Sequence, residues 1–337
     1  MPDISLGLAL VLLLILGAEF VNGWTDAPNA IATVVGTRSL SPGAAVLMAG
    51  VLNFAGVLSG TAVASTIAKD IIDPRIVDLT TVGGAMVGII LWSSLAARFG
   101  IPTSETHALI SGLTGAGLAT AGTDVLLWEG WKKTLLGLVF STFLGFGGGL
   151  LMMIAVYWMF RRVSPGRGKP WFRRMQIFSS AFMAFGHGSN DGQKFMGAFT
   201  LALALAGTQG AVLTPSKVTI PLWVMVLCAL VMFCGTITGG WSIMKTMGMR
   251  VTRLETHQGF AAETGAASTI QLASALGIPV STTHTISTAI MGVGAVRRVS
   301  AVRWGVTQEL VTAWVLTFPI CGLIAFSVVK LIRWLIP

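Results

Sequence analysis

The chain has 337 residues, of which 54% are hydrophobic and 10% are charged, with 41 glycines and a single tyrosine. Soluble domains carry roughly a quarter charged residues, so this composition excludes an ordinary soluble protein. The net charge of +9 would suit a nucleic-acid-binding protein, but the basic residues lie in short connections between apolar runs. Nucleic acid is therefore excluded as a partner, and insertion into a lipid bilayer with basic loops on one side explains the charge better.

Five apolar runs are each near or above the roughly 18 to 20 residues that a helix needs to cross the hydrocarbon core of a membrane. They are Ile4 to Val21, Pro42 to Ile67, Leu135 to Phe160, Ile220 to Met244 and Val302 to Val329. The alternating segments of about ten residues that are typical of a membrane barrel are missing. The sequence therefore predicts an all-α, polytopic membrane protein.

One stretch of the chain occurs twice. Gly100 to Gly117 and Gly277 to Gly294 are identical at 8 of 18 positions, with the common core Gly-Ile-Pro-x-Ser-x-Thr-His. Gly and Pro end a helix, and the hydroxyl residues that follow are suited to start a new one, so each copy predicts the tip of a helical hairpin. Such a break is tolerated at membrane depth only where protein buries it or water reaches it. We therefore expect the two tips to meet near the membrane midplane, around one substrate.

Three further matches occur in the same order along both halves of the chain. Asp26 in Asn-Gly-Trp-Thr-Asp-Ala-Pro-Asn-Ala matches Asp191 in Gly-His-Gly-Ser-Asn-Asp-Gly-Gln-Lys, 165 residues later. Gly-x-x-Ser-Gly from Gly56 matches Gly-x-x-Thr-Gly from Gly235, and Gly88 matches Gly265. A duplication explains ordered matches better than coincidence does. The predicted units are repeats 1–166 and 167–337, each with a broken helix at its Asp motif and one helical hairpin.

The charges of the connections predict how the two repeats insert. The stretch from Arg161 to Arg174 is strongly basic and should be cytoplasmic. Counting back gives three crossings if Leu79 to Ala121 is a re-entrant hairpin and five if both arms span, so the N-terminus should lie outside. An odd number of crossings per half makes the repeats antiparallel, which is the inverted-topology plan of many secondary transporters.

Two aspartates within apolar sequence need compensation in this plan. An Asp at membrane depth costs roughly 2.5 to 3.5 kcal/mol on insertion scales. Asp26 and Asp191 are therefore candidates for binding a cation or a proton, with Asn29, Asn190 and carbonyl groups of the broken helices as further oxygen ligands. The alternative is that each Asp only caps the half-helix that follows it. Their recurrence at matching positions favours the cation site.

The hairpin tips carry the candidate anion site. Free backbone N–H groups and the positive end of the helix dipole, at the start of each second arm, favour a negatively charged ligand. Ordinary helix capping accounts for one hydroxyl in each tip, but not for a cluster that recurs in both. Glu105 breaks the symmetry because Thr282 takes its place, and it could bind a cation, carry a proton or point away from the anion. The candidates are Ser104, Glu105, Thr106, Ser281, Thr282 and Thr283.

Four other polar residues in apolar sequence are candidates. His107 and His284 are paired by the repeat and could relay protons, although such a His more often donates an interhelical hydrogen bond. Lys194 could meet the anion or pair with Asp191. Glu263 lies in a hairpin arm and is a weaker candidate for the cation. The three cysteines have no metal-ligand spacing and are assigned no chemistry.

These motifs resemble those of the inorganic phosphate transporter (PiT) family. Asp26 to Ala30 looks like the Asn-Asp-x-Ala-Asn-Ala signature of that family, and His187 to Lys194 looks like the bacterial low-affinity form of its second copy. The Gly-Ile-Pro-x-Ser-x-Thr-His tips resemble its hairpins in both halves. Thr25 stands where many members have Asn or His, Pro28 where Ala is usual, and Glu105 where a small or hydroxyl residue is common. These departures bear on the coupling ion more than on the substrate.

The resemblance implies a symporter, and no enzyme, that moves inorganic phosphate with Na⁺ or H⁺. The two aspartates would help to bind the cation, and the hairpin hydroxyls would bind phosphate. Lys194 is added to the phosphate site as our own candidate from the sequence. No cofactor is expected, and a neutral metal phosphate complex is an alternative substrate. The implied location is the plasma membrane, the inner membrane of a bacterium, and a homodimer is left open.

Three competing hypotheses stand beside this interpretation. A sulfate or other oxyanion permease of the same family fits because a dipole and hydroxyl site measures size and charge only coarsely. A passive anion channel differs in that it would not concentrate its substrate. An intramembrane hydrolase lacks support, because no Gly-x-Gly-Asp or Gly-x-Ser-x-Gly nucleophile motif occurs.

Overall fold

The computed structural model describes residues 5–207, 212–213, 218–250 and 254–335, nearly all of them helical. The helices of the first half are α1 (Leu6–Thr25), α2 (Ala27–Gly36), α3 (Pro42–Leu58), α4 (Ala62–Lys69), α5 (Leu79–Arg98), α6 (Glu105–Ala121) and α7 (Trp128–Phe160). Those of the second half are α8 (Pro165–His187), α9 (Gln193–Leu205), α10 (Leu222–Thr238), α11 (Trp241–Lys245), α12 (Thr256–Ala275), α13 (Thr282–Arg297) and α14 (Trp304–Leu335). The remaining elements are short: 3₁₀ turns at Gly122–Val125 and Val299–Ala301, π turns at Gly188–Gly192 and Thr246–Arg250, and an antiparallel pair of strands, β1 (Val212–Leu213) and β2 (Val218–Thr219).

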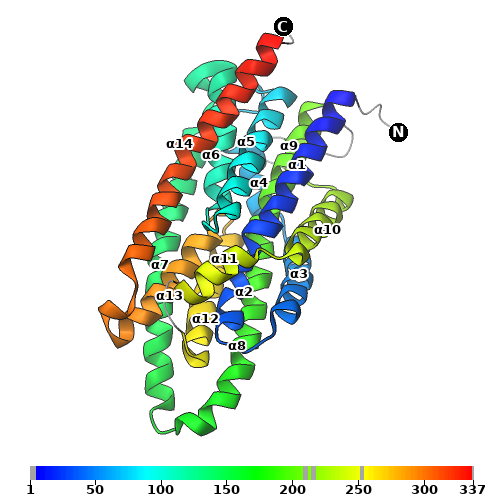
Figure 1. The fold of residues 1–337 in the computed structure, drawn as a ribbon. Helices are drawn as coiled ribbons and strands as arrows, with labels where there is room; N and C mark the ends of the chain where they lie inside the picture. Colours follow the sequence, from blue (N-terminus) through cyan, green and yellow to red (C-terminus); the bar gives the residue numbers. More distant parts are fainter. Residues whose placement is uncertain (1–4, 208–211, 214–217, 251–253, 336–337) are drawn as a thin grey trace.

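The two halves of the chain enter the bundle from opposite ends. Figure 1 shows the hairpin of α5 and α6 in the upper half and that of α12 and α13 in the lower half. The start of α1 and the end of α14 lie at the upper end, while α7 and α8 join at the lower end. The two hairpins also have the same spacing throughout, since α5 begins at Leu79 and α12 at Thr256, 177 residues later, and α6 at Glu105 and α13 at Thr282. This is the arrangement expected of inverted repeats.

Helices of one half pack mainly against helices of the other. The second hairpin arm α6 packs along α14, and its counterpart α13 packs along α7. In the same way α1 packs on α10, and α3 packs on α8. The long helix that ends each half therefore packs along the hairpin of the opposite half, and the two halves interlock.

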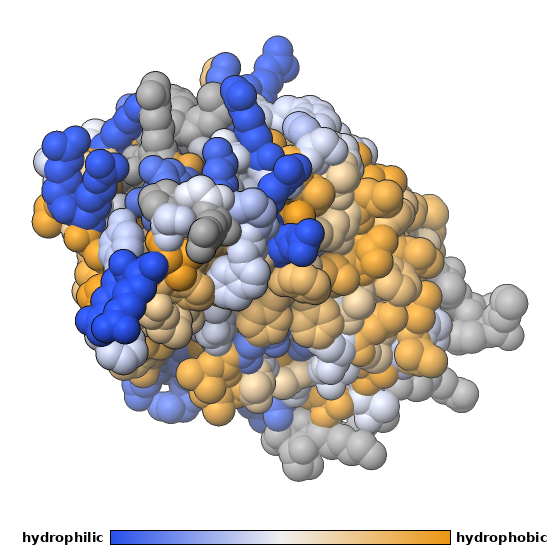
Figure 2. All heavy atoms as spheres, turned by 90° about the horizontal axis from the view of Figure 1, so that it is seen from below, coloured by the Kyte–Doolittle hydropathy of each residue, from blue (hydrophilic) through white to orange (hydrophobic). Residues whose placement is uncertain are grey.

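The surface fits a membrane environment. Four helices of the described residues are long and apolar enough to cross a membrane, namely Leu6–Gly36, Leu79–Arg98, Trp128–Phe160 and Trp304–Leu335, and two bent pairs raise the number to six if each counts as one span. On α7, Phe143 and Leu151 are 71% and 66% exposed, as lipid-facing side chains would be. Seen from below, hydrophilic side chains gather on the end face and apolar ones cover the flank (Figure 2).

Two apolar runs that were predicted to cross as single helices are bent pairs instead. The axes of α3 and α4 meet at 69°, and those of α10 and the segment that begins with α11 meet at 63°. Each bend falls on a Gly-x-x-Ser/Thr-Gly motif. The Ser59 Oγ donates to the Gly56 carbonyl at 2.6 Å, and the Thr238 Oγ1 donates to the Gly235 carbonyl at 2.6 Å. These hydroxyls compete with the backbone amides that would continue the helix, so both helices end there.

The Asp motifs interrupt their helices less than the sequence suggested. Only Asp26 separates α1 from α2, and its N–H still donates to the Asn22 carbonyl at 2.9 Å. Pro28 has no N–H to offer to the preceding turn, which accounts for the break. In the second half, the chain passes from α8 into α9 through the π turn Gly188–Gly192, which contains Asp191. Such turns are concentrated at functional sites.

Glycines at the crossings of α3 with α8 and of α10 with α1 allow the backbones to touch. An added Cβ at Gly56 would overlap the carbonyl oxygen of Phe185, and one at Gly235 would overlap that of Phe20.

We expect Gly56→Ala or Gly235→Ala to lower the free energy of unfolding by about 1–3 kcal/mol through overpacking, measured by thermal unfolding in detergent. Gly147→Ala is the control. Apart from the backbone of its own helix, nothing in the described part of the chain comes within 4 Å of an added Cβ there, and Ala is favoured over Gly in a helix. An equal loss in the control variant would contradict this explanation.

Candidate functional site

The two aspartates meet where both hairpins end. Asp26 is 2% exposed and Asp191 is fully buried. The Thr282 Oγ1, at the start of α13, lies 2.8 Å from the Asp191 Oδ2 and 3.4 Å from the Asp26 Oδ2. Its one hydroxyl hydrogen can be donated to only one carboxylate at a time. The start of the second hairpin arm therefore joins the Asp of its own repeat to the Asp of the other.

Neutral donors surround Asp26. The Asn29 Nδ2, one turn further along α2, donates to the Asp26 Oδ1 at 2.5 Å and to the Thr283 Oγ1 at 3.0 Å. Thr283, from the hairpin of the opposite repeat, donates its own hydroxyl to the same carboxylate oxygen. Among the described residues, the Asn29 Oδ1 has no hydrogen-bond partner although it is buried. A carboxylate and an unpaired amide oxygen are thus left together in a buried site, which suits a cation.

A charged donor pairs with Asp191. The Lys194 Nζ donates to the Asp191 Oδ1, to the Thr106 Oγ1 at 2.5 Å and to the Val280 carbonyl at 2.8 Å. An ammonium group has three hydrogens, so these three acceptors use all of them. Of the two roles open to Lys194 from the sequence, the observed contacts are those of an ion pair with Asp191, and they leave no ammonium hydrogen for an anion in this conformation.

The hairpin tips touch each other. The Thr106 Oγ1 of the first tip donates to the Val280 carbonyl of the second at 2.7 Å, and the rings of His107 and His284 lie edge to face with centroids 4.5 Å apart. The first-turn amides of α6 and α13 have no carbonyl of their own helix to bind, so both tips bring donors to one place. The positive ends of two helix dipoles converge there, an arrangement that would favour an anion.

The two tip serines act as helix caps. The Ser104 Oγ accepts a hydrogen bond from the His107 N–H at 3.3 Å, and the Ser281 Oγ accepts one from the His284 N–H at 3.2 Å. The alternative of ordinary capping therefore accounts for these contacts. The threonines at the next positions make the contacts that reach the aspartates and Lys194, so they distinguish the tips from simple helix starts.

Asn190 holds the second tip in place. Its Oδ1 accepts from the Val280 N–H at 3.2 Å, and its Nδ2 donates to the Ile278 carbonyl at 3.2 Å and to the Ser274 Oγ at 2.9 Å. These bonds connect the π turn with the loop between α12 and α13. The contacts of Asn190 are thus with the hairpin, not with the Asp pair, and they position the backbone around the site.

The two histidines lie in an aromatic cluster beside the tips. The His107 Nδ1 lies 3.2 Å from the Trp314 carbonyl, and the His284 ring stacks on Trp314 with centroids 3.7 Å apart. The His284 Nδ1 is 3.5 Å from the Thr142 Oγ1, at the limit of a hydrogen bond. These contacts fit the alternative in which each His makes an interhelical hydrogen bond. The proton relay stays a hypothesis.

The two glutamates have different hydrogen-bond partners. The Thr25 Oγ1 on α1 donates to the Glu105 Oε1 at 3.0 Å, so Glu105 faces α1 while its counterpart Thr282 faces the aspartates. Glu263, on α12, accepts hydrogen bonds from Thr33 on α2 and Ser179 on α8. Both glutamates are buried, but the structure holds them in separate polar clusters.

A polar stripe leads from Asp26 toward the lower end of the bundle. Asp26, Asn29, Thr33 and Thr37 recur every three or four residues along α2 and its caps, so they share one face. Thr33 contacts Glu263, as described, and Thr37 donates its hydroxyl to the Gln176 Oε1 at 2.8 Å. Equivalent positions on α9 are Ala198 and Ala202, so only the first repeat carries such a stripe.

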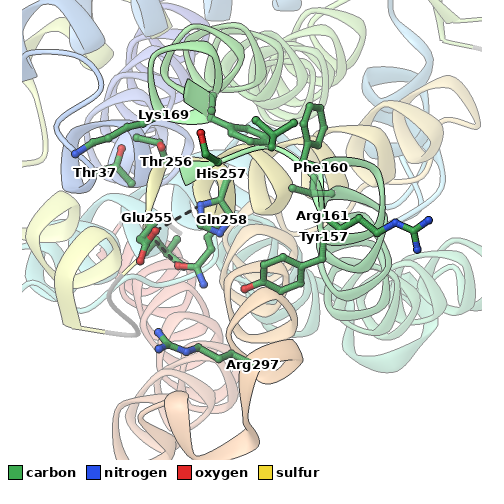
Figure 3. Close-up of a pocket in the computed structure, with 16 residues that line it drawn as sticks. Thr37, Tyr157, Phe160, Arg161, Lys169, Glu255, Thr256, His257, Gln258 and Arg297 are labelled. Carbon is green, nitrogen blue, oxygen red and sulfur yellow. Dashed lines mark hydrogen bonds and ion pairs between the residues drawn. The ribbon is translucent and has the colours of Figure 1, made fainter. Parts of the chain in front are cut away.

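The stripe ends at a cavity between the ends of α7, α8 and α12. This cavity has a volume of about 710 Å³, and Thr37 lines it. Figure 3 shows Lys169 near Thr37, with Arg297 at the far side and Glu255 beside His257 between them. The His257 Nδ1 lies 3.6 Å from the Glu255 Oε2. Both signs of charge therefore border the cavity at the end of the stripe.

The sequence is similar to those of known proteins. Residues 22–325 match the phosphate transporter family. The chain belongs to that family. It is 46% identical over 308 residues to a protein of Rhizobium meliloti (strain 1021) described as a probable low-affinity inorganic phosphate transporter, with 91% of each chain covered. A protein of Bacillus subtilis (strain 168) with the same description is 38% identical over 328 residues, which cover 96% of this chain and 97% of the other.

The fold is also similar to a solved structure. A sodium-dependent phosphate transporter superposes with a TM-score of 0.90 over 98% of this chain and 100% of the other, at 24% sequence identity. This likeness supports the all-α fold predicted from the sequence. Membership of the family confirms the resemblance of the motifs, and since the family is one of transporters, the chain is a multi-pass membrane transporter and not an enzyme.

Sequence reasoning missed two residues of the site. The His187 Nε2 lies 3.4 Å from the Asp191 Oδ2, and the His187 Nδ1 lies 3.0 Å from the Asn53 Oδ1. Asn53 in turn donates to the Thr236 Oγ1 at 3.0 Å. The four-residue spacing between His187 and Asp191 could have revealed the first contact, because such residues share a helix face. No local signal reveals the second, which joins α3 to α8.

The capping role of the serines can be tested. Ser104→Ala or Ser281→Ala should lower the free energy of unfolding by about 1 kcal/mol, because the third amide of the following helix loses its acceptor. Ser104→Asn keeps a good cap and should retain wild-type stability in the same thermal unfolding assay. Equal destabilisation by Ala and Asn would count against capping.

Proposed function

We propose that this transporter is a symporter that moves inorganic phosphate together with a cation, Na⁺ or H⁺. Phosphate binds between the two hairpin tips, where the first-turn amides and threonine hydroxyls of α6 and α13 converge. The cation binds at Asp26, with Asp191 beside it. One observation carries the proposal: Thr282, at the start of a hairpin arm, lies within hydrogen-bonding distance of both aspartates.

This sharing of atoms explains how the two fluxes are coupled. A cation at Asp26 removes the negative charge that would repel phosphate from the adjacent tip, and bound phosphate in turn stabilises the cation. Each ligand therefore raises the affinity for the other, as linkage requires. Rocking of the oppositely oriented halves would then expose the site alternately to the two sides, with the cavity at the lower end as one approach.

Several finer assignments belong to this proposal. The repeats are residues 1–166 and 167–337, and the membrane is the bacterial plasma membrane, as the bacterial origin of the relatives suggests. The sodium-dependent transporter of similar fold supports Na⁺ as the coupling ion. Glu263 and the His107 and His284 pair remain candidates for a further cation and a proton path.

The first test removes one charge. Asp26→Asn should reduce phosphate uptake driven by a cation gradient to the level of empty vesicles, since the amide cannot balance a cation, while folded protein is still obtained. Uptake of labelled phosphate into reconstituted vesicles, under separate Na⁺ and H⁺ gradients, measures this. The control is Asp124→Asn, which changes an exposed Asp in the turn after α6. Wild-type accumulation by the Asp26 variant would refute the role given to this residue.

The same vesicles separate the competing functions. A symporter concentrates phosphate inside above its external level only when a cation gradient is present. A passive anion channel brings the two concentrations to equality whatever the gradient. Excess unlabelled sulfate should leave phosphate accumulation unchanged, whereas equal competition would support a general oxyanion permease.

A second candidate substrate is a neutral complex of phosphate with a divalent metal. One observation favours it: a ring nitrogen of His187 and carboxylate oxygens of Asp26 and Asp191 all lie within 4.8 Å of one another. Among the described residues, the His187 Nε2 has no hydrogen-bond partner. One imidazole and two carboxylates are a suitable ligand set for a divalent ion.

This candidate predicts that phosphate uptake depends on metal. A chelator should suppress wild-type uptake, and Mg²⁺ or Zn²⁺ should restore it. His187→Gln should weaken the metal dependence because the amide is a poorer ligand for such an ion. Uptake that is unaffected by the chelator would remove the metal complex as substrate and leave free phosphate.

A further inference from the structure

The two repeats place a nitrogen in the same relation to their aspartates. Asn29 stands three residues after Asp26, and Lys194 stands three residues after Asp191. Each side-chain nitrogen donates to the Asp of its own repeat and to a threonine in the hairpin of the opposite repeat, namely Thr283 for Asn29 and Thr106 for Lys194. The two half-sites thus have one plan.

They differ in charge. The nitrogen of the first half-site belongs to a neutral amide, and that of the second belongs to an ammonium group. The Lys194 Nζ sits among a carboxylate, a hydroxyl and a main-chain carbonyl oxygen. Such a mixture of oxygens coordinates Na⁺ in transporters built from broken helices. The Lys194 ammonium group therefore occupies the position at which a half-site with these oxygen atoms would otherwise bind a free cation.

The first half-site differs from the second in that its aspartate is surrounded by uncharged donors. The donors to Asp26 are Asn29, Thr282 and Thr283, all of them uncharged, and the Asn29 Oδ1 is unpaired among the described residues. With both carboxylates ionised, one ammonium group leaves the pair with one net negative charge. A buried net charge is costly, and one bound cation would balance it.

From this geometry we infer that Lys194 is a permanent counter-cation that takes the place of a mobile one in the second half-site. The transporter then binds one exchangeable cation at the aspartate pair, at Asp26. Lys194 is a specificity-determining residue, since it sets the number of cations that accompany each phosphate. This inference rests on the proposed cation coupling, but cation binding can be measured without transport.

The central variant is Lys194→Asn, which gives the second half-site the side chain of the first. Removing the ammonium should open a second cation site at Asp191. The melting temperature of the purified protein is then measured without phosphate, in Na⁺ and in choline. Its rise with Na⁺ should fit two cation sites in Lys194→Asn and one cation site in the wild type.

Transport supplies the second readout. In reconstituted vesicles, labelled phosphate is measured together with labelled Na⁺, or with a pH dye in the lumen. The number of cations carried with each phosphate should rise from n in the wild type to n + 1 in Lys194→Asn. Lys132→Asn is the matched control, because Lys132 also pairs with an acidic residue three positions earlier, Glu129, on the exposed surface. It should leave the number at n.

A double variant keeps the test decisive. Asp191→Asn combined with Lys194→Asn removes both charges of the ion pair and should return cation binding to a single site. If Lys194→Asn alone gives no folded protein but the double variant does, the uncompensated carboxylate is the cause and the inference is supported. Loss of both variants overturns it, because the lysine would then be needed for more than its charge.

Two outcomes separate the inference from the proposed function. If the wild type shows no phosphate uptake driven by a cation gradient, the proposed function fails, whatever the variants bind. If the wild type is coupled but Lys194→Asn binds and carries the same number of cations, only the inference fails.

Discussion

Two carboxylates held close together in an apolar interior are the constraint on which the rest of this structure depends. A single buried charge is expensive, and a second one of the same sign beside it adds repulsion. Asp26 and Asp191 are tolerated because hydroxyl, amide and ammonium donors surround them. Two donors to Asp26, Thr282 and Thr283, come from the hairpin of the opposite repeat. The Lys194 ammonium group that pairs with Asp191 also donates to Thr106 in the other hairpin. The meeting of the hairpin tips is therefore the electrostatic condition for burying both aspartates.

The interlocked packing makes that meeting possible. Because α6 lies along α14 and α13 lies along α7, each hairpin is held by a long helix of the other half. The glycines on α7 allow a close approach, since an added Cβ at Gly145 or Gly149 would overlap the backbone of α13. Any movement of one tip against the other must therefore carry a long helix with it. The same contacts that build the site tie its opening to a motion of the whole bundle.

The sequence predicted those parts of the structure that appear as matches between the two halves of the chain. The two hairpins, the paired aspartates and the opposite orientation followed from ordered matches and from the charges of the loops. The bends after Gly56 and Gly235 were present only as a further match, because the hydroxyl bonds that end those helices are invisible in hydropathy. The contacts of Lys194 with the hairpin tips, and those of Asn53, depend on how helices are rotated against one another. In helices that are apolar on all sides, no periodic pattern encodes that rotation.

The two half-sites differ in charge, and this difference determines how the duplicated site would respond to a cation and to phosphate. With an ammonium group in both, the aspartates would be neutral at all times, and phosphate could enter without a cation. With an amide in both, two cations would have to assemble before the repulsion disappeared. In the symport proposed above, with one of each, the pair of ionised aspartates keeps a single negative charge, so an arriving phosphate would be repelled until one cation is bound, and its binding would then retain that cation. The departure from symmetry at Asn29 and Lys194 thus converts two similar ends of broken helices into an ordered pair of binding events.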